Sequence, residues 1–269
     1  MKVKAVEDRR KKMFDDNSKS LFYRAWTKLI LAYLASFALS FMVGIFLIKI
    51  LKTPPEALFE ISTRRLSFAF PVFETGSSLG IDQGVLLFIW NSLGSLVTIS
   101  FLYTAALFNP RDISLFPKTL RKALCGKNKM KLLCFLPGCR AIEDEPIRRL
   151  YVWLMVPWLG MLLLGMESGL TVSTSAGIFG SYLAGFISLL PHGVIEIPAI
   201  AFGGAAAFGA HLLVRKNIGE KGTAEIFEEV ERYKEGISPA KIILIVISSL
   251  LVAGLIEGHL TEMILDSLL

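Results

Sequence analysis

Residues 176–214 read AGIFGSYLAGFISLLPHGVIEIPAIAFGGAAAFGAHLLV, and Glu196 is the only Asp, Glu, Lys or Arg in these 39 residues. As one helix the stretch would be about 58 Å long, whereas the hydrocarbon core of a bilayer is about 30 Å thick. Two helices joined by a tight turn at 191–193 fit that thickness better. We therefore predict membrane-inserted helices at 176–190 and 193–214.

Four further apolar runs predict membrane segments at 29–48, 85–108, 150–166 and 240–265. Mean hydropathy is +0.57 and 19% of residues are charged, below the roughly 25% of soluble domains. The charges are segregated into loops because a charged side chain at mid-bilayer costs at least about 2.5–3.5 kcal/mol. The sequence thus predicts an all-α, polytopic transmembrane helical bundle with about six membrane-inserted segments, in which residues 29–269 form a single membrane domain.

The distribution of basic residues predicts the orientation. Residues 1–28 carry nine basic and four acidic residues, residues 109–149 carry ten and four, and residues 49–83 carry four of each. Because cytoplasmic loops are enriched in Lys and Arg, we expect a basic cytoplasmic N-terminal segment, a basic cytoplasmic loop at 109–149, and location in the cell membrane. The side of 215–239 stays open, since six full crossings put it outside and a re-entrant segment would put it inside.

Three cysteines, Cys125, Cys134 and Cys139, lie in the basic loop. An odd number in a reducing compartment argues against a disulfide framework. The spacing C-x8-C-x4-C is not a typical zinc spacing. We therefore expect reduced thiols.

Small residues recur every four positions in three of the predicted segments. In lipid, such stripes let helix backbones approach closely. They exceed what one short bundle needs, so we expect a homodimer or a stable complex with another membrane protein. The stripes are Ala176, Gly180, Ala184 and Ser188; Ala199, Gly203 and Ala207; and Ser249 and Ala253, leading to Glu257.

Polar groups inside the predicted segments are the candidate site. Glu196 and Glu257 have no basic neighbour in sequence, and His192 shares a helix face with Glu196 at a spacing of four. Pro198 removes the usual partner of a carbonyl one turn earlier. Asn91 is the costliest polar group of the segment at 85–108 to leave unpaired in lipid. Intramembrane carboxyl groups are functional-site candidates by default.

Three interpretations of these residues remain open. In the structural one, His192 and Glu196 pair with Glu257, His259 or Asn91 and lock the bundle. In the second, the carboxyls form a transport or ion site. In the third, His192 and Glu196 bind a metal with Glu257 or His259, although H-x-x-x-E lacks the second His of H-E-x-x-H. In each case we expect the carboxyls of Glu196 and Glu257 to lie within about 10 Å of each other, because antiparallel packing of their helices matches their depths.

Several function classes find no support in the sequence. It contains no Walker loop, no Gly-rich dinucleotide fingerprint and no G-x-S-x-G elbow. Cytoplasmic loops that face anionic lipid explain the basic charge, so the lipid bilayer is an expected partner and nucleic acid is not. We expect no cofactor, apart from the ion of the metal alternative. The lack of these motifs favours a protein that is not an enzyme.

The run LLPHGVIEIPA at 189–199 closely resembles the signature of the stage II sporulation protein M family, which reads roughly L-P-H-G-x-x-E-x-P before a helix rich in small residues. Asn91 and the AGLIE run at 253–257 are similar to two further family features. The resemblance covers the second half of the chain, matches the first half mainly in topology, and does not extend to 118–145.

The best-known bacterial member of that family is a membrane subunit of a complex used in engulfment during sporulation, together with cell-wall-degrading partners. Relatives occur in organisms that do not sporulate, archaea included, and the chain resembles such a non-sporulation member. The resemblance implies a non-enzymatic scaffold or complex subunit. The alternatives are a transporter or channel-like protein that uses Glu196 and Glu257, and, third, a membrane metalloenzyme.

Overall fold

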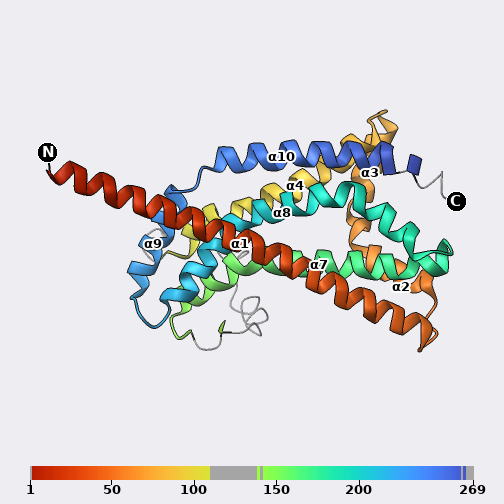
Figure 1. Cartoon of the computed structure of the whole chain (residues 1–269), viewed down its shortest axis with the longest axis horizontal. Helices are drawn as coiled ribbons and strands as arrows, with labels where there is room; N and C mark the ends of the chain where they lie inside the picture. The colour runs from red at the N-terminus through yellow and green to blue at the C-terminus, as the bar shows by residue number, and fades with distance from the viewer. Residues whose placement is uncertain (1, 110–137, 140–141, 262, 265–269) are drawn as a thin grey trace. The chain divides into compact units, whose positions relative to one another are not determined.

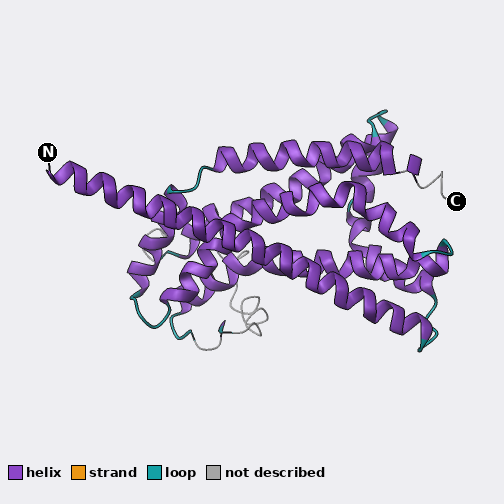
Figure 2. Cartoon of the chain, viewed as in Figure 1, coloured by secondary structure: helices purple, strands orange, loops and turns teal. Residues whose placement is uncertain are grey.

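The computed structural model describes residues 2–109, 138–139, 142–261 and 263–264 (Figure 1). All of the regular structure in these residues is helical, and none of them forms a strand (Figure 2). The predicted all-α class is therefore confirmed. The helical elements in chain order are α1 (Lys2–Lys49), α2 (Pro55–Thr63), η1 (Arg64–Phe68), α3 (Phe70–Ser78), α4 (Gln83–Tyr103), η2 (Thr104–Phe108), α7 (Glu145–Ile178), α8 (Tyr182–Asn217), α9 (Thr223–Glu235), α10 (Pro239–Leu255) and η5 (Ile256–Thr261).

Five of the described helices are long and apolar enough to cross a membrane. The multi-span architecture predicted from the apolar runs is confirmed, with five continuous helices where about six segments were expected. The spans are Asn17–Lys49, Gln83–Phe108, Glu145–Ile178, Tyr182–Asn217 and Pro239–Thr261.

The difference in number comes from the stretch 176–214. The predicted turn at 191–193 is wrong, because α8 continues through Pro191 and Pro198. A proline removes one backbone hydrogen bond, and membrane helices tolerate this where neighbouring groups satisfy the freed carbonyl. The chain turns instead at Gly180, whose φ of 75° lies in the left-handed region that glycine adopts without strain.

Because the chain turns earlier than predicted, two predicted segments differ from those in the structure. The predicted stripe from Ala176 to Ser188 is split, because α7 ends at Ile178 and α8 begins at Tyr182. The segment predicted at 150–166 becomes the 34-residue helix α7, so Glu167 lies inside a helix rather than in a loop. The stripe on α8 does pack as expected, since Ala199, Gly203 and Ala207 are all buried.

The chain forms two compact units, each built from segments far apart in the sequence. Unit 1 holds 23 of the 29 Lys and Arg residues: eight in its first segment, ten in its second and five in its third. The interpretation of residues 29–269 as one membrane domain stays a prediction. Unit 1 comprises Met1–Thr27, Val97–Pro157 and Gly204–Ala240, and unit 2 comprises Lys28–Leu96, Trp158–Gly203 and Lys241–Leu269.

In unit 1, ring nitrogens tie three helix ends together. The indole N–H of Trp153 donates to the carbonyl of Phe101 at 3.1 Å and to the hydroxyl of Thr104 at 3.0 Å. Nδ1 of the buried His211 lies 3.0 Å from the carbonyl of Tyr151. These bonds join the end of α4, the start of α7 and the end of α8.

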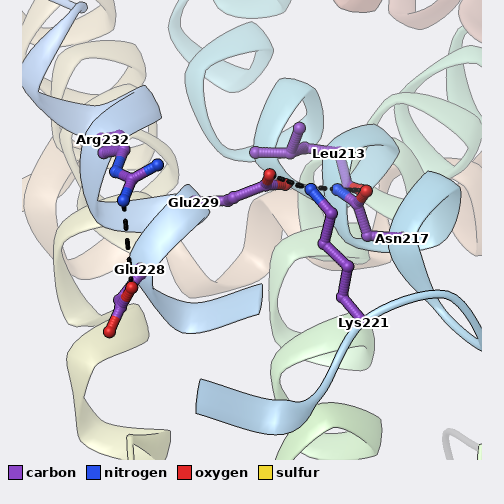
Figure 3. Close-up of polar contacts among 6 residues, drawn as sticks. All are labelled: Leu213, Asn217, Lys221, Glu228, Glu229 and Arg232. Atoms are coloured by element: carbon purple, nitrogen blue, oxygen red, sulfur yellow. Dashed lines mark hydrogen bonds and ion pairs between the residues drawn. The ribbon is translucent and has the colours of Figure 1, made fainter. Parts of the chain in front are cut away.

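A polar network attaches α9 to the end of α8 within the same unit (Figure 3). Asn217 Nδ2 donates to the carbonyl of Leu213 at 3.0 Å and also to the carboxylate of Glu229. Lys221 forms an ion pair with the same carboxylate. Further along α9, Arg232 lies 3.9 Å from Glu228. Asn217 and Lys221 thus offset the charge of Glu229, so this carboxylate does not oppose burial of the apolar face of α9.

That face is anchored by Tyr233, which is 1% exposed. A Cβ added at Gly209 would lie 2.0 Å from its hydroxyl oxygen, so the glycine makes room for the ring. Burial, with Tyr103 as a further cause, raises the pKa of Tyr233 above its ordinary value and keeps the phenol neutral.

The expectation of reduced thiols is wrong for Cys139, the one cysteine among the described residues. Cys139 is fully buried and disulfide-bonded, which differs from the expected reduced thiol. Cys125 and Cys134 lie outside the described residues.

In unit 2, α1 and α7 touch backbone to backbone. A Cβ added at Gly165 would lie 2.4 Å from the carbonyl oxygen of Tyr33, and one at Gly169 would lie 2.3 Å from that of Phe37. Ser40 lies in this contact and donates to the carbonyl of Gly165 at 3.3 Å. Small residues every four positions therefore pack the two helices through van der Waals contact and hydrogen bonds, which are what associates helices in lipid.

We predict that Gly169→Ala destabilises the protein by about 1–3 kcal/mol, because the added methyl group meets backbone atoms that cannot rotate away. Gly160→Ala on the same helix is the matched control, since nothing lies within 4 Å of a Cβ there. Helix propensity alone makes that control neutral or stabilising by up to about 1 kcal/mol. Thermal unfolding of both variants in one detergent measures the difference. Equal midpoints would contradict the α1–α7 contact.

Candidate functional site

The candidate site begins with a local change of helix type at the end of α10. Residues Ile256–Thr261 form the π-helix η5, which continues α10 and carries both Glu257 and His259. Single π-helical turns within α-helices occur frequently at functional sites. Because side chains two positions apart do not face each other, Glu257 and His259 point to different sides.

Glycines place η5 against the start of α4 in unit 2. A Cβ at Gly254 would lie 2.7 Å from the carbonyl oxygen of Gly84, and one at Gly258 would lie 2.6 Å from the Gly84 Cα atom. No other residue fits such a backbone contact without displacing one of the helices. The position of Glu257 is thus set by its two flanking glycines.

Asp82 fixes the other side of η5. Its Oδ1 accepts a hydrogen bond from the backbone N–H of Val85 at 3.2 Å, which caps α4, while its Oδ2 lies 3.4 Å from Nε2 of His259. The His259 side chain is 59% exposed. His259 therefore pairs with Asp82 and is not part of the buried cluster, which removes it from the metal set considered from sequence. Sequence analysis missed Asp82, although an Asp three residues before Val85 is a recognisable helix cap.

On α8, His192 and Glu196 lie one helical turn apart and face the same direction, as predicted. Nε2 of His192 is 3.9 Å from Oε1 of Glu257. One ligand atom each from His192, Glu196 and Glu257 lie within 4.8 Å of one another. The predicted approach of the two carboxyls is confirmed, and the structure brings three of the sequence-predicted residues into one cluster.

The two carboxyls of the cluster have no basic partner. Among the described residues, no Lys or Arg forms an ion pair with Glu196 or Glu257. His192 is 7% exposed, and both carboxyls are only partly accessible. An ionised carboxylate in such surroundings costs several kcal/mol, so this site requires protons or a cation.

A buried phenol lies within electrostatic range of the cluster. Tyr33 of α1 is 3% exposed, and its hydroxyl lies near Ser168 and within electrostatic range of Glu196. The α1–α7 glycine contact places this hydroxyl, because the Tyr33 carbonyl is one of the atoms that Gly165 touches. Sequence analysis missed Tyr33, since nothing in its local pattern separates it from other core aromatics.

Two further predicted residues are not metal ligands. Asn91 lies half-buried in α4, and its part in the polar cluster stays a prediction. Pro198 stands inside α8, two positions after Glu196, and contributes through the backbone rather than through a ligand atom. The arrangement is thus one imidazole and two carboxyls, which can share protons, lock two helices together or coordinate one cation.

The sequence model of the family described as Stage II sporulation protein M matches residues 122–262, just over half of the 269 residues. Comparisons with curated proteins and with solved structures gave no match. The matched segment contains α7 to η5 and therefore all three clustered residues. With its L-P-H-G-x-x-E-x-P run at 190–198 inside that segment, the chain belongs to the stage II sporulation protein M family.

Proposed function

We propose that this protein is a non-enzymatic subunit of a membrane complex, assembled as a homodimer or with another membrane protein. The supporting observation is an apolar groove of about 300 Å³ along α1 and α7 in unit 2. Its polar residues are Ser36 and Ser40, which belong to the close α1–α7 contact. The groove is lined by Ser36, Leu39, Ser40, Val43, Leu162, Leu163, Met166 and Leu170.

Such a groove suits a partner helix. The apolar walls give a second helix van der Waals contacts that lipid tails fill less well. Leu39 and Leu163 are 62% and 48% exposed, so the walls are open to a partner. The family resemblance supports the same role, because its best-known member is a subunit of a membrane complex.

We also propose that the N-terminus is cytoplasmic. With five spans, residues on α9 lie on the same side as the N-terminus, and η1 lies on the other side. This arrangement groups the basic segments of unit 1 on the side that the positive-inside rule assigns to the cytoplasm.

A second candidate function is supported by the cluster itself. Two carboxyls and an imidazole within membrane-spanning helices are the groups with which transporters bind protons and cations. The chain in this case moves an ion or an ion-coupled solute, and Glu196 and Glu257 carry the charge.

For the complex, Val43→Trp should weaken association at least about tenfold, or by about 1.4 kcal/mol, because the indole fills the groove. Met42→Trp is the matched control: Met42 is 59% exposed on the same helix and does not line the groove. Mass measurement in mild detergent and in nanodiscs reports the assembly. A wild-type protein that stays a lone monomer under all conditions would overturn the proposal.

For the orientation, Ser67→Cys in η1 should react with a membrane-impermeant maleimide on intact cells. Glu225→Cys on α9 should react only after permeabilisation, with the wild-type chain as background. Both side chains are exposed, so access to the reagent depends on the side of the membrane. The reverse labelling pattern would invert the topology.

For the transport candidate, Glu196→Gln should abolish proton uptake driven by a Na⁺ or K⁺ gradient in proteoliposomes while the thermal midpoint stays near wild type, since glutamine keeps the size but removes the charge. Glu225→Gln on the exposed face of α9, outside the spans, should leave the flux intact. If wild-type proteoliposomes carry no such flux, transport of these ions is excluded and the complex-subunit function stands alone.

A further inference from the structure

The cluster of His192, Glu196 and Glu257 lacks positive charge. When both carboxyls are ionised they carry −2 together, and no Lys or Arg pairs with them among the described residues. A divalent cation would neutralise this charge in full, whereas a protonated imidazole would neutralise only half of it. Buried charges in proteins are either paired or coordinate a metal.

The geometry brings the donors to coordinating range. Their ligand atoms lie within 4.8 Å of one another, and they come from two different helical elements, α8 and η5. A tetrahedral ion with bonds of about 2.0–2.2 Å holds its ligand atoms about 3.3–3.6 Å apart. Small side-chain rotations of the two glutamates close that difference without moving a helix.

The imidazole provides an independent observation. His192 is 7% exposed, and its Nδ1 is buried without a hydrogen-bond partner. Its Nε2 faces Glu257 at 3.9 Å, beyond hydrogen-bond distance. Buried polar groups nearly always find a partner. His192 is thus buried with neither nitrogen in a hydrogen bond, and its Nε2 faces the Glu257 carboxyl across a gap that an ion could bridge.

The donor set selects the class of ion. Mg²⁺ and Ca²⁺ are bound almost entirely by oxygen. An imidazole together with carboxylates suits Zn²⁺ and its divalent transition-metal neighbours. His259 adds no fourth ligand, because it pairs with Asp82, so water occupies the remaining position.

We propose that His192, Glu196 and Glu257 bind one divalent transition-metal ion of the zinc class, which fastens α8 to η5. The ion replaces the missing positive charge of the cluster. This inference goes beyond the role in a complex and does not depend on it, because the site lies within one chain.

The test uses the full-length protein with a non-histidine affinity tag, purified in mild detergent and stripped with a chelator. Titration with Zn²⁺ should load about one ion per chain, measured by elemental analysis after desalting. Zn²⁺ should also raise the thermal midpoint of the stripped wild-type protein, because a ligand that binds only the folded state stabilises it. Mg²⁺ and Ca²⁺ at the same concentration should not. Co²⁺ should give a visible absorption spectrum that reports its coordination.

The variants assign the ligands. Glu257→Gln and Glu196→Gln should each weaken Zn²⁺ binding at least about a hundredfold, because losing a supporting residue of a metal site already costs roughly 10–100-fold. His259→Gln is the matched control: it removes a histidine from the same π-helix, and affinity should be unchanged. Circular dichroism verifies the fold of each variant.

Two results would overturn the proposal. One is a wild-type protein that binds Zn²⁺ no more tightly than about 1 mM, the scale of weak surface sites. The other is loss of binding in His259→Gln while Glu257→Gln binds Zn²⁺ as the wild type does, which would place the ion at the exposed His259–Asp82 pair. If the cluster variants do not fold, the wild-type midpoint with and without Zn²⁺ decides: no shift contradicts the site.

Discussion

Close backbone contact between helices is the constraint on which the rest of unit 2 depends. In lipid, the hydrophobic effect does not drive helices together, because lipid tails are as apolar as the side chains. Helices therefore associate where their backbones come near enough for dense packing and weak polar contacts. Gly165 and Gly169 give α7 this approach to α1, and Gly254 and Gly258 give α10 and η5 the same approach to α4. Each contact forms where the chain has no side chain at all.

These contacts also position polar groups. The α1–α7 contact holds Tyr33 within electrostatic range of Glu196, and the α4–η5 contact aims Glu257 at His192. Glycine therefore has an indirect chemical role, because it sets the depth and rotation of the helices that carry the ionisable residues. The cluster joins residues 65 positions apart in the chain, His192 and Glu257, and among the described residues no Lys or Arg forms an ion pair with its carboxyls.

The polar groups of unit 1 are arranged differently. This unit holds most of the basic residues, and several of its polar groups pair with one another: Glu229 pairs with Asn217 and Lys221, and Trp153 bonds to Thr104. Glu229 lies on α9, outside the spans, where water and long charged side chains can pair with it. Where water and long charged side chains are available, charges pair locally, whereas within the spans the few polar groups have only each other.

The sequence by itself determined the helical class, the multi-span architecture and the pairing of His192 with Glu196 on one face, because hydrophobic run length and the i, i+4 spacing are local properties. It also gave the approach of Glu196 and Glu257. Tertiary structure decided the remainder. Pro191 lies in the interior of a helix, the chain turns at Gly180, and His259 pairs with Asp82. These outcomes depend on which neighbouring groups bond to a free backbone carbonyl or pair with a charged side chain. The π-helical turn of η5 could not be predicted from the local sequence, since it accompanies the contact of Gly258 with Gly84 on another helix.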